Sequence, residues 1–228
     1  MKKLLALLTA LLMLLLPMAA MADKLDLSYV ERNIDKLFEL DINEDQNVAF
    51  VDTTLSASSR SFVHKYESSY RYSTTEFDVL IVNYASSTSN YPILRMWVSY
   101  CADDDFLYFD SVSFNVDGQI FTFTGVGSSD RRDSDDKGCV ERGLIKFDES
   151  NIDFLIALEN YAPSISQTSS ADDYDNYPVY MTLHGTEDIT VTLSSGFWLD
   201  FFAMREAFLQ MNGMEYISRP DGTPMTTK

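Results

Sequence analysis

The feature that most constrains the fold is a β-hairpin within residues 106–124. Apolar and polar residues alternate on both sides of Asp117-Gly118, and an Asp-Gly pair in this setting is the strongest short-range hairpin signal. A two-residue turn fixes a register in which apolar residues face apolar ones and hydroxyls face hydroxyls. The predicted pairs are Val116 with Gln119, Phe114 with Phe121, Val112 with Phe123, and Ser113 with Thr122.

A second hairpin is predicted around residues 185–187. Apolar residues alternate with polar ones from Val179 to His184 and again from Ile189 to Leu193. A three-residue loop pairs Leu183 with Ile189 and keeps one apolar face along both strands. The same register places His184 opposite Asp188.

Helical patterns flank these strands. Helices are expected over residues 23–40 with a capping box at Ser28 and Glu31, over 151–161 with Ser150 as the cap, and over 196–212 with Ser194 or Ser195 as the cap. Further strands are expected over residues 48–55, 62–66, 70–73, 77–84 and 93–100, polar loops over 127–138 and 164–177, and a flexible tail over 214–228. This order predicts one α+β domain over residues 23–213, with a mostly antiparallel sheet that is either single or sandwich-like.

The first 22 residues have the pattern of a secretory signal peptide. Lys2 and Lys3 precede an apolar run over residues 4–16, and Ala20-Met21-Ala22 is typical of a cleavage site. The run has 13 residues, fewer than the ~18 that a membrane helix needs. We therefore expect cleavage after Ala22, no integral membrane segment in the mature chain, and a periplasmic or extracellular location.

Charge and cysteine content narrow the function classes. The formal net charge is −18, which disfavours a nucleic-acid partner because phosphate backbones are repelled. In an exported protein, the two cysteines of the mature chain, Cys101 and Cys139, favour a disulfide. That bond would stabilise the chain by about 3–4 kcal/mol in the loop-entropy account.

A weak calcium-binding pattern follows the first predicted helix. Its oxygen-bearing residues are Asp41, Asn43, Asp45, Asn47 and Asp52, at loop positions 1, 3, 5, 7 and 12. Gln46 stands where a calcium loop requires glycine, and Asp52 is shorter than the usual glutamate. A polar turn between two elements is the competing interpretation, so Ca²⁺ is the one possible cofactor.

Part of the chain resembles a class of uncharacterised bacterial secreted proteins and lipoproteins. The resemblance lies in residues 94–100 (LRMWVSY), in Asp105-Phe106-Leu107-Tyr108-Phe109 and in Val116-Asp117-Gly118. The pattern of that class is similar to LRxxVxYxxxDWLFIxSxxFxVDG. This chain differs at Phe106, where tryptophan is common, and at Thr182, where a basic residue is often found. The resemblance implies a shared hairpin fold and no particular activity.

No catalytic motif is present, and the sequence predicts a binding protein. His184 beside Asp188 could act as a general base, but the sequence places no nucleophile next to the pair. We therefore expect an exported, non-catalytic protein that binds a protein or glycan partner. A hydrolase with an unrecognised site and a calcium-stabilised surface module are the alternatives.

Overall fold

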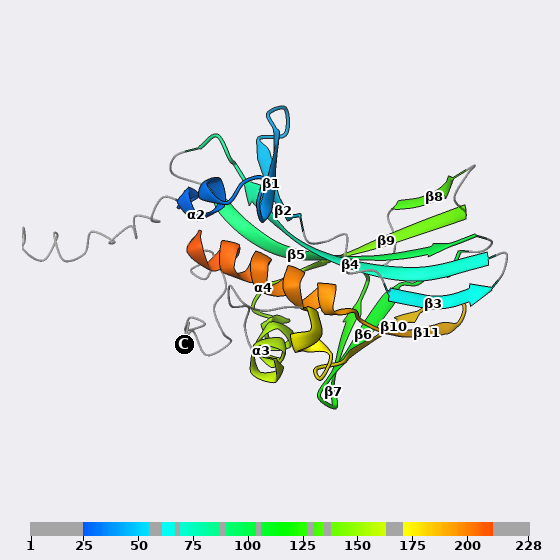
Figure 1. Cartoon of the computed structure of the whole chain (residues 1–228). Coiled ribbons are helices and arrows are strands. Elements are labelled where there is room, and N and C mark those ends of the chain that lie inside the picture. The colour runs from blue at the N-terminus through cyan, green and yellow to red at the C-terminus, as the bar shows by residue number, and fades with distance from the viewer. Residues whose placement is uncertain are drawn as a thin grey trace, which may run out of the picture.

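Two antiparallel sheets and three α-helices form the fold of the computed structural model (Figure 1). The structure describes residues 25–54, 61–66, 69–86, 90–103, 106–126, 130–134, 138–162 and 171–211. This architecture confirms the predicted α+β class with a mostly antiparallel sheet. The predicted signal peptide, residues 1–22, and the predicted tail, residues 214–228, lie outside the described residues.

The larger sheet has seven strands, in the order β1-β2-β4-β5-β9-β8 with β3 also paired to β4. Its strands are β1 (Phe38–Asn43), β2 (Val48–Thr53), β3 (Ser61–Tyr66), β4 (Ser69–Val82), β5 (Tyr91–Ala102), β8 (Asp130–Ser134) and β9 (Gly138–Lys146). Both β2 and β3 pair with the same side of β4, β2 down to Asp78 and β3 from Ser73. The sheet is therefore forked where β4 passes Phe77.

The smaller sheet has four strands in the order β11-β10-β6-β7. These are β6 (Ser111–Val116), β7 (Gln119–Thr124), β10 (Val179–His184) and β11 (Asp188–Thr192). All predicted cross-strand pairs of both hairpins are confirmed. Asp117 and Gly118 have φ values of 49° and 82°, the positive values that a type I′ turn requires.

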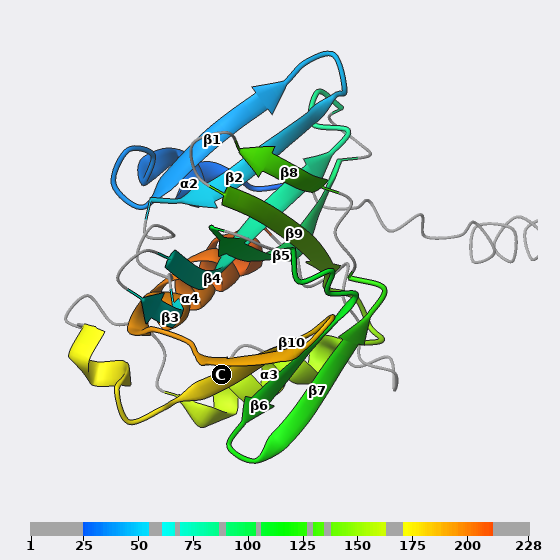
Figure 2. The ribbon, with the colours of Figure 1, turned by 90° about the vertical axis from the view of Figure 1, so that its right-hand side faces the viewer.

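Helices cover one face of each sheet (Figures 1 and 2). They are α2 (Ser28–Arg32), α3 (Ile152–Tyr161), the short 3₁₀-helix η2 (Ala171–Tyr174) and α4 (Ser195–Gln210). Helix α4 packs on the larger sheet, where Phe197 and Phe201 lie against Phe77 with ring centroids 5.7 and 5.4 Å away. Buried apolar side chains of both sheets and all three α-helices form one cluster. None of the described helices combines the length and the hydropathy needed to span a bilayer.

Among the described residues, the predicted helix over residues 23–40 forms only at Ser28–Arg32, and Leu27 is its N-cap in place of the predicted capping box. The carbonyl oxygen of Asn33 accepts the N–H groups of Lys36, Leu37 and Phe38, which closes a tight turn, and Asp35 has a left-handed φ of 64°. Phe38 then begins β1. Pairing with β2 thus overrides the local helical pattern. The ladder of hydrogen bonds between β1 and β2 stabilises the strand, and helix propensity, which depends only on local sequence, does not include it.

The predicted disulfide between Cys101 and Cys139 is not formed. Both thiols are buried, but in the β5–β9 ladder Cys139 pairs with Ala102 while Cys101 pairs with Val140. Directly opposed residues share a face and successive residues alternate faces. The two side chains therefore point to opposite sides of the sheet.

Other element boundaries also differ from the predictions. Residues 70–73 and 77–82 belong to one continuous strand, β4, and β8 lies inside the predicted loop over residues 127–138. Helix α3 follows Asn151 rather than Ser150 as its N-cap.

Candidate functional site

The outward face of the larger sheet, opposite to α4, carries a row of charged residues. Side chains of one rung across five strands share this face: Glu39, Asp52, Asp78, Arg95 and Lys146. Neighbouring strands lie ~4.8 Å apart, so three carboxylates stand side by side on β1, β2 and β4. Like charges directly opposite each other destabilise a sheet, and this arrangement therefore requires a compensating interaction.

Part of that compensation is a buried ion pair. Arg95 donates from Nε to Asp78 Oδ1 at 2.8 Å and from its terminal nitrogen to Asp78 Oδ2. The two side chains are only 7% and 5% exposed, and Trp97 Nε1 donates to the same carboxylate at 3.1 Å. Arg95 also lies over the ring of Phe50, 5.2 Å from its centroid. A bidentate ion pair that is shielded from water in this way holds both side chains in a defined orientation.

A second ion pair lies beside Trp97. Arg142 donates to Glu76 Oε2 at 3.0 Å and to Ser99 Oγ at 3.3 Å. Its guanidinium carbon lies 4.7 Å from the centroid of the Trp97 ring, within the range of a cation–π interaction. Trp97 thus contacts both Arg142 and Arg95, whose guanidinium carbon lies 5.7 Å from the centroid of its ring.

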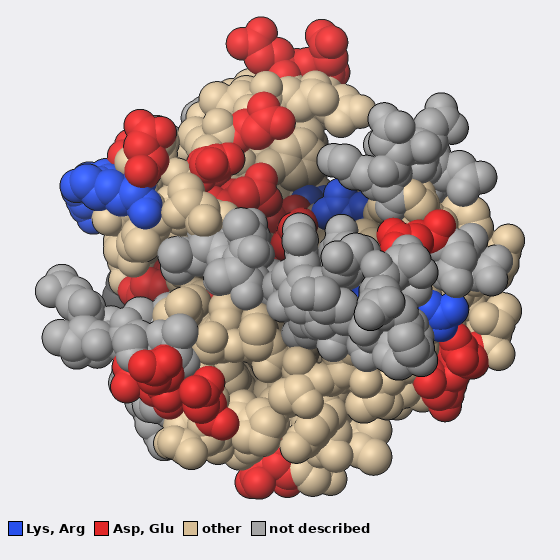
Figure 3. Space-filling model, turned by 45° about the vertical axis from the view of Figure 1, so that its right-hand side comes forward, with Lys and Arg blue, Asp and Glu red and all other residues tan. Residues whose placement is uncertain are grey.

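These residues line a pocket with a volume of about 500 Å³. The carboxylates of Glu39, Asp41 and Asp52 form one wall, next to the two ion pairs. Both arginines are paired with other acids, whereas these three carboxylates form no ion pair with any described residue. Five acidic and two basic residues line the pocket. Figure 3 shows acidic atoms spread over the molecule, with small basic areas recessed near the middle of the view and one larger basic group at its left edge.

Asp52 is electrostatically the most perturbed residue of the pocket. Desolvation and the neighbouring Asp78, Glu76 and Glu39 raise its pKa from 3.8 to about 6, although Arg95 opposes the rise. The cause is positional, because its partners on both adjacent strands are acids. A titratable group perturbed in this way inside a pocket is typical of functional sites.

A further carboxyl group lies beneath the fork of the sheet. Asp200 of α4 is fully buried, and its Oδ2 accepts the N–H of Phe77 at 2.7 Å. Phe77 lines the pocket, so Asp200 contacts the pocket floor from the core side. Its Oδ1 has no hydrogen-bond partner among the described residues. Burial, with smaller contributions from Glu76, Asp52 and Asp78, holds its pKa well above the ordinary range.

The smaller sheet carries a different polar face. One rung consists of hydroxyl side chains on all four strands: Thr190, Thr182, Ser113 and Thr122. Next to this rung, His184 Nε2 lies 2.8 Å from Ser113 Oγ and His184 Nδ1 lies 3.0 Å from Asp188 Oδ1. The predicted pairing of His184 with Asp188 is confirmed, and Ser113 is a hydroxyl neighbour that the sequence did not place there. The acid–imidazole–hydroxyl order is that of a catalytic triad.

The five calcium candidates lie along the β1–β2 hairpin and not around one centre. Asn43 Oδ1 accepts the N–H of Gln46, and Asn47 Oδ1 accepts that of Ala85. Asp52 pairs with Glu39, four positions along the strands from the pair nearest the turn, Asn43 and Val48. That separation is about 13 Å at ~3.3 Å per residue. The structure therefore does not bring Asp41, Asn43, Asp45, Asn47 and Asp52 together, and the described residues contain no group of three or more His, Cys, Asp or Glu arranged to hold a metal ion.

Two of the five candidates, Asp41 and Asp52, nevertheless lie in the acidic pocket. Sequence reasoning missed Glu39, Asp78 and Arg95, although Arg95 stands inside the resemblance pattern. The available signal was the alternation of Glu76 and Asp78 with the apolar Phe77 and Val79 along β4, which gives that part of the strand a polar face.

No protein-family model matches this chain, and no curated protein or solved structure was found to be similar to it.

Proposed function

We propose that this protein is an exported, non-catalytic binding protein that holds a small organic cation in the acidic pocket of the larger sheet. The observation that carries the proposal is the charge distribution within one concavity. Glu39, Asp41 and Asp52 have no cationic partner among the described residues, while both arginines of the pocket are already paired. The secretory signal that the sequence predicts supports a location outside the cytoplasm.

An amine fits this arrangement better than the other ligand classes. An ammonium group carries three donors and a positive charge, which can serve the carboxylates of Glu39 and Asp52 on adjacent strands. An anionic ligand would be repelled by the net acidity of the pocket. The volume of about 500 Å³ lies within the range of small-molecule sites, roughly 300–1,000 Å³, and leaves room for a diamine or a lysine-like side chain.

The raised pKa of Asp52 is consistent with a site that favours a cation. Desolvation and the adjacent carboxylates disfavour another negative charge there. A bound ammonium group would supply the missing positive charge and lower the pKa of Asp52 again. Amine binding should therefore release protons at pH values near 6 and weaken as the pH falls below 6.

Calorimetric titration of the protein with putrescine, spermidine and lysine amide tests the proposal, with 1,4-butanediol as the uncharged control. Trp97 provides a second readout, because its ring contacts both arginines of the pocket and its fluorescence should change on binding. We expect saturable binding of the amines, weakened by salt and by Asp52→Asn and Glu39→Gln. Asp172→Asn removes the same charge outside the pocket and should leave binding unchanged. If none of the three amines binds, or if both pocket variants bind them as well as the wild type does, the proposal is wrong.

A second candidate function rests on the Asp188–His184–Ser113 chain. With this geometry Ser113 Oγ could attack an ester carbonyl, His184 Nε2 would take the serine proton and deliver it to the leaving alcohol, and water would then hydrolyse the acyl-serine. Two features place this function second. Asp188 is 69% exposed, and Ser113 lies in mid-strand between β7 and β10, where its N–H belongs to the sheet ladder rather than to an oxyanion hole.

Labelling with a fluorophosphonate probe decides between the two functions. A hydrolase would be labelled at Ser113, and labelling would disappear in His184→Ala. The binding function predicts no labelling at Ser113 under conditions that label a control serine esterase fully.

A further inference from the structure

Strand β7 is an end strand of the smaller sheet. Within the described part of the chain it pairs with β6 alone. The type I′ turn makes Val116 and Gln119 a hydrogen-bonded pair, and bonded and non-bonded pairs then alternate along the hairpin. The N–H and C=O groups of Ile120, Thr122 and Thr124 therefore point away from β6. Each of these residues offers one donor and one acceptor to an additional strand.

Strand β7 itself lacks the sequence features that protect an edge against such pairing. Natural sheets guard their edges with charged residues, prolines or bulges, whereas Gln119–Thr124 has no charge and no proline. Its pairing with β6 runs without a register shift, and Ile120 is 69% exposed. The end strands of the larger sheet differ, because Glu39 and Asp41 lie on β1 and four of the five residues of β8 are charged.

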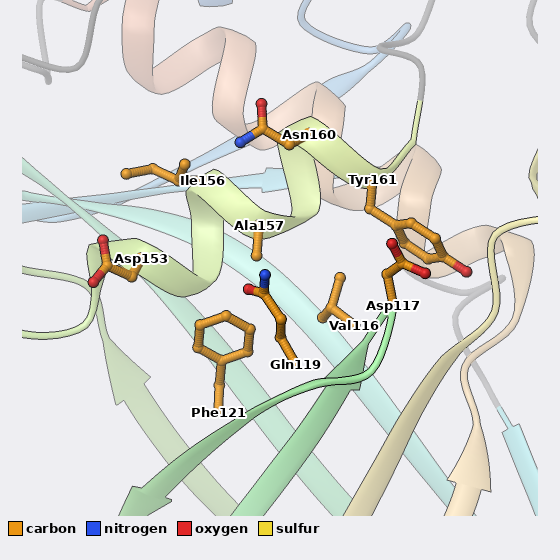
Figure 4. A pocket seen from close by; sticks show the side chains of 9 residues that line it. All are labelled: Val116, Asp117, Gln119, Phe121, Asp153, Ile156, Ala157, Asn160 and Tyr161. Carbon is orange, nitrogen blue, oxygen red and sulfur yellow. The ribbon is translucent and has the colours of Figure 1, made fainter.

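A groove of about 450 Å³ runs between this edge and α3 (Figure 4). Phe121 and Gln119 lie on the strand side, and Ile156 and Ala157 belong to the helix side. Phe121 is only half-buried. Every second side chain of an added strand would point into this groove. Both walls of the groove offer apolar atoms for these side chains to contact.

The acidic residues of the groove indicate which charge a partner should carry. Asp153 lies near one end of the groove and Asp117 near the other (Figure 4), and none of the described lysines and arginines lines it. The chain as a whole has a formal net charge of −18, which opposes the approach of a second copy and favours a basic segment. A polypeptide is required because only another backbone presents donors and acceptors at the strand repeat.

We propose that β7 is a docking strand, to which an extended basic segment of another protein adds by β-strand pairing while its inward side chains fill the groove beside α3. This site is separate from the acidic pocket, since the two lie on different sheets and share no lining residue. The proposal therefore does not depend on the amine-binding function.

The probe is an amidated nonapeptide that alternates lysine and valine, with the same peptide N-methylated at alternate residues as the non-pairing control. Binding is followed by fluorescence polarisation, and amide hydrogen exchange is measured by NMR. We expect the unmodified peptide to bind, the methylated peptide not to bind, and the amides of Ile120, Thr122 and Thr124 to gain protection. Binding without protection of these amides would overturn the proposal, as would equal binding of the methylated peptide.

Thr122→Pro removes one outward N–H at an edge position where proline is tolerated. It should weaken binding by up to about tenfold, the upper factor expected from the loss of one hydrogen bond. Thr122→Val keeps the N–H and loses only the hydroxyl bond to Ser113, and should bind like the wild type. Should Thr122→Pro fail to fold, Ala157→Arg, which fills the groove and adds a positive charge on the helix surface, should abolish binding.

Unchanged affinity in a folded Thr122→Pro variant, or in Ala157→Arg, would refute strand addition at this edge. Sedimentation of the free protein supplies the remaining outcome. A dimer that dissociates in Thr122→Pro would show that a second copy occupies the edge, against the proposal.

Discussion

The substitution Asp52→Asn should make the protein more stable while it weakens amine binding. Asp52 faces Glu39 on one side and Asp78 on the other, and asparagine has nearly the same shape without the charge. The folded protein raises the pKa of Asp52 from 3.8 to about 6, with desolvation as the largest cause. A carboxyl group with a raised folded pKa contributes stability that is fully present below pH 3.8 and is lost as the pH rises through 6.

The size of the effect follows from the two pKa values. A pKa of about 6 in place of 3.8 corresponds to an upper limit of ~3 kcal/mol at about 1.4 kcal/mol per unit. Asp52 is partly accessible to water, and solvent screening reduces this to about 1–2 kcal/mol. For a chain of this size, we expect the midpoint of thermal unfolding above pH 7 to rise by about 3–6 °C.

Thermal unfolding of the wild type and Asp52→Asn at pH 4, 6 and 8 provides the measurement. The gain from the substitution should be largest at pH 8, nearly as large at pH 6 and small at pH 4, because it develops between the unfolded and the folded pKa. Asp172→Asn serves as the control, because it removes one charge from an exposed position outside the pocket. An identical midpoint difference at pH 4 and pH 8, or a loss of stability at pH 8, would refute the electrostatic reasoning.

The remaining predictions concern the core. The pKa of Asp200 is raised well above 3.8 by burial, so its contribution to stability is present below pH 3.8 and is lost as the pH rises through the folded value. In urea unfolding, the free energy of unfolding of Asp200→Asn relative to the wild type should therefore be most favourable at pH 9. If this difference were the same at pH 5 and pH 9, ionisation of Asp200 would not be its cause. A Cβ atom at Gly143 would lie 2.6 Å from the Val126 carbonyl oxygen, so Gly143→Ala should lower the free energy of unfolding by about 1–3 kcal/mol. An unchanged urea midpoint would show that the segment at Val126 moves away from β9 without cost. Cys101 and Cys139 should both be alkylated when the protein is denatured without reductant, whereas a mass spectrum with neither thiol labelled would show that they are bonded.

Turn chemistry made the two hairpins of the smaller sheet predictable from the sequence, but not the pairing of β6 with β10 that joins them. Asp117-Gly118 permits one two-residue turn, and that turn determines every pair between β6 and β7. The loop after His184 determines the pairs between β10 and β11 in the same way. Information of this kind is local, because a few adjacent residues specify a register that then extends along both strands.

The larger sheet depends on contacts between distant residues, and the sequence predicted it less well. Val30, Ile34 and Phe38 have helical spacing, yet Phe38 pairs with Thr53 in β1. The disulfide prediction failed for a related reason, since only the β5–β9 register shows that Cys101 and Cys139 face opposite sides.

The acidic pocket could not be assembled from sequence because its charges come from separate strands. Alternation shows that Asp52, Asp78 and Arg95 each lie on a polar face, but it does not show that the three strands are neighbours. The ladder places these residues in one rung, and that adjacency raises the pKa of Asp52. The contact of the buried Asp200 with Phe77 is even harder to predict, because the two residues lie 123 positions apart in the sequence.

Both proposed sites are places where the chain departs from the rules that stabilise sheets. In both places negatively charged residues are present. Like charges stand opposite each other across β1, β2 and β4, and the edge of β7 is left unguarded beside Asp117 and Asp153. Each departure costs stability or solubility in the free protein, and a cationic partner would relieve each of them. Because the pocket and the groove share no residue, Asp52→Asn should leave peptide binding unchanged and Thr122→Pro should leave amine binding unchanged. If either substitution weakened both activities, general attraction by the acidic surface would explain the binding, and neither site would be specific.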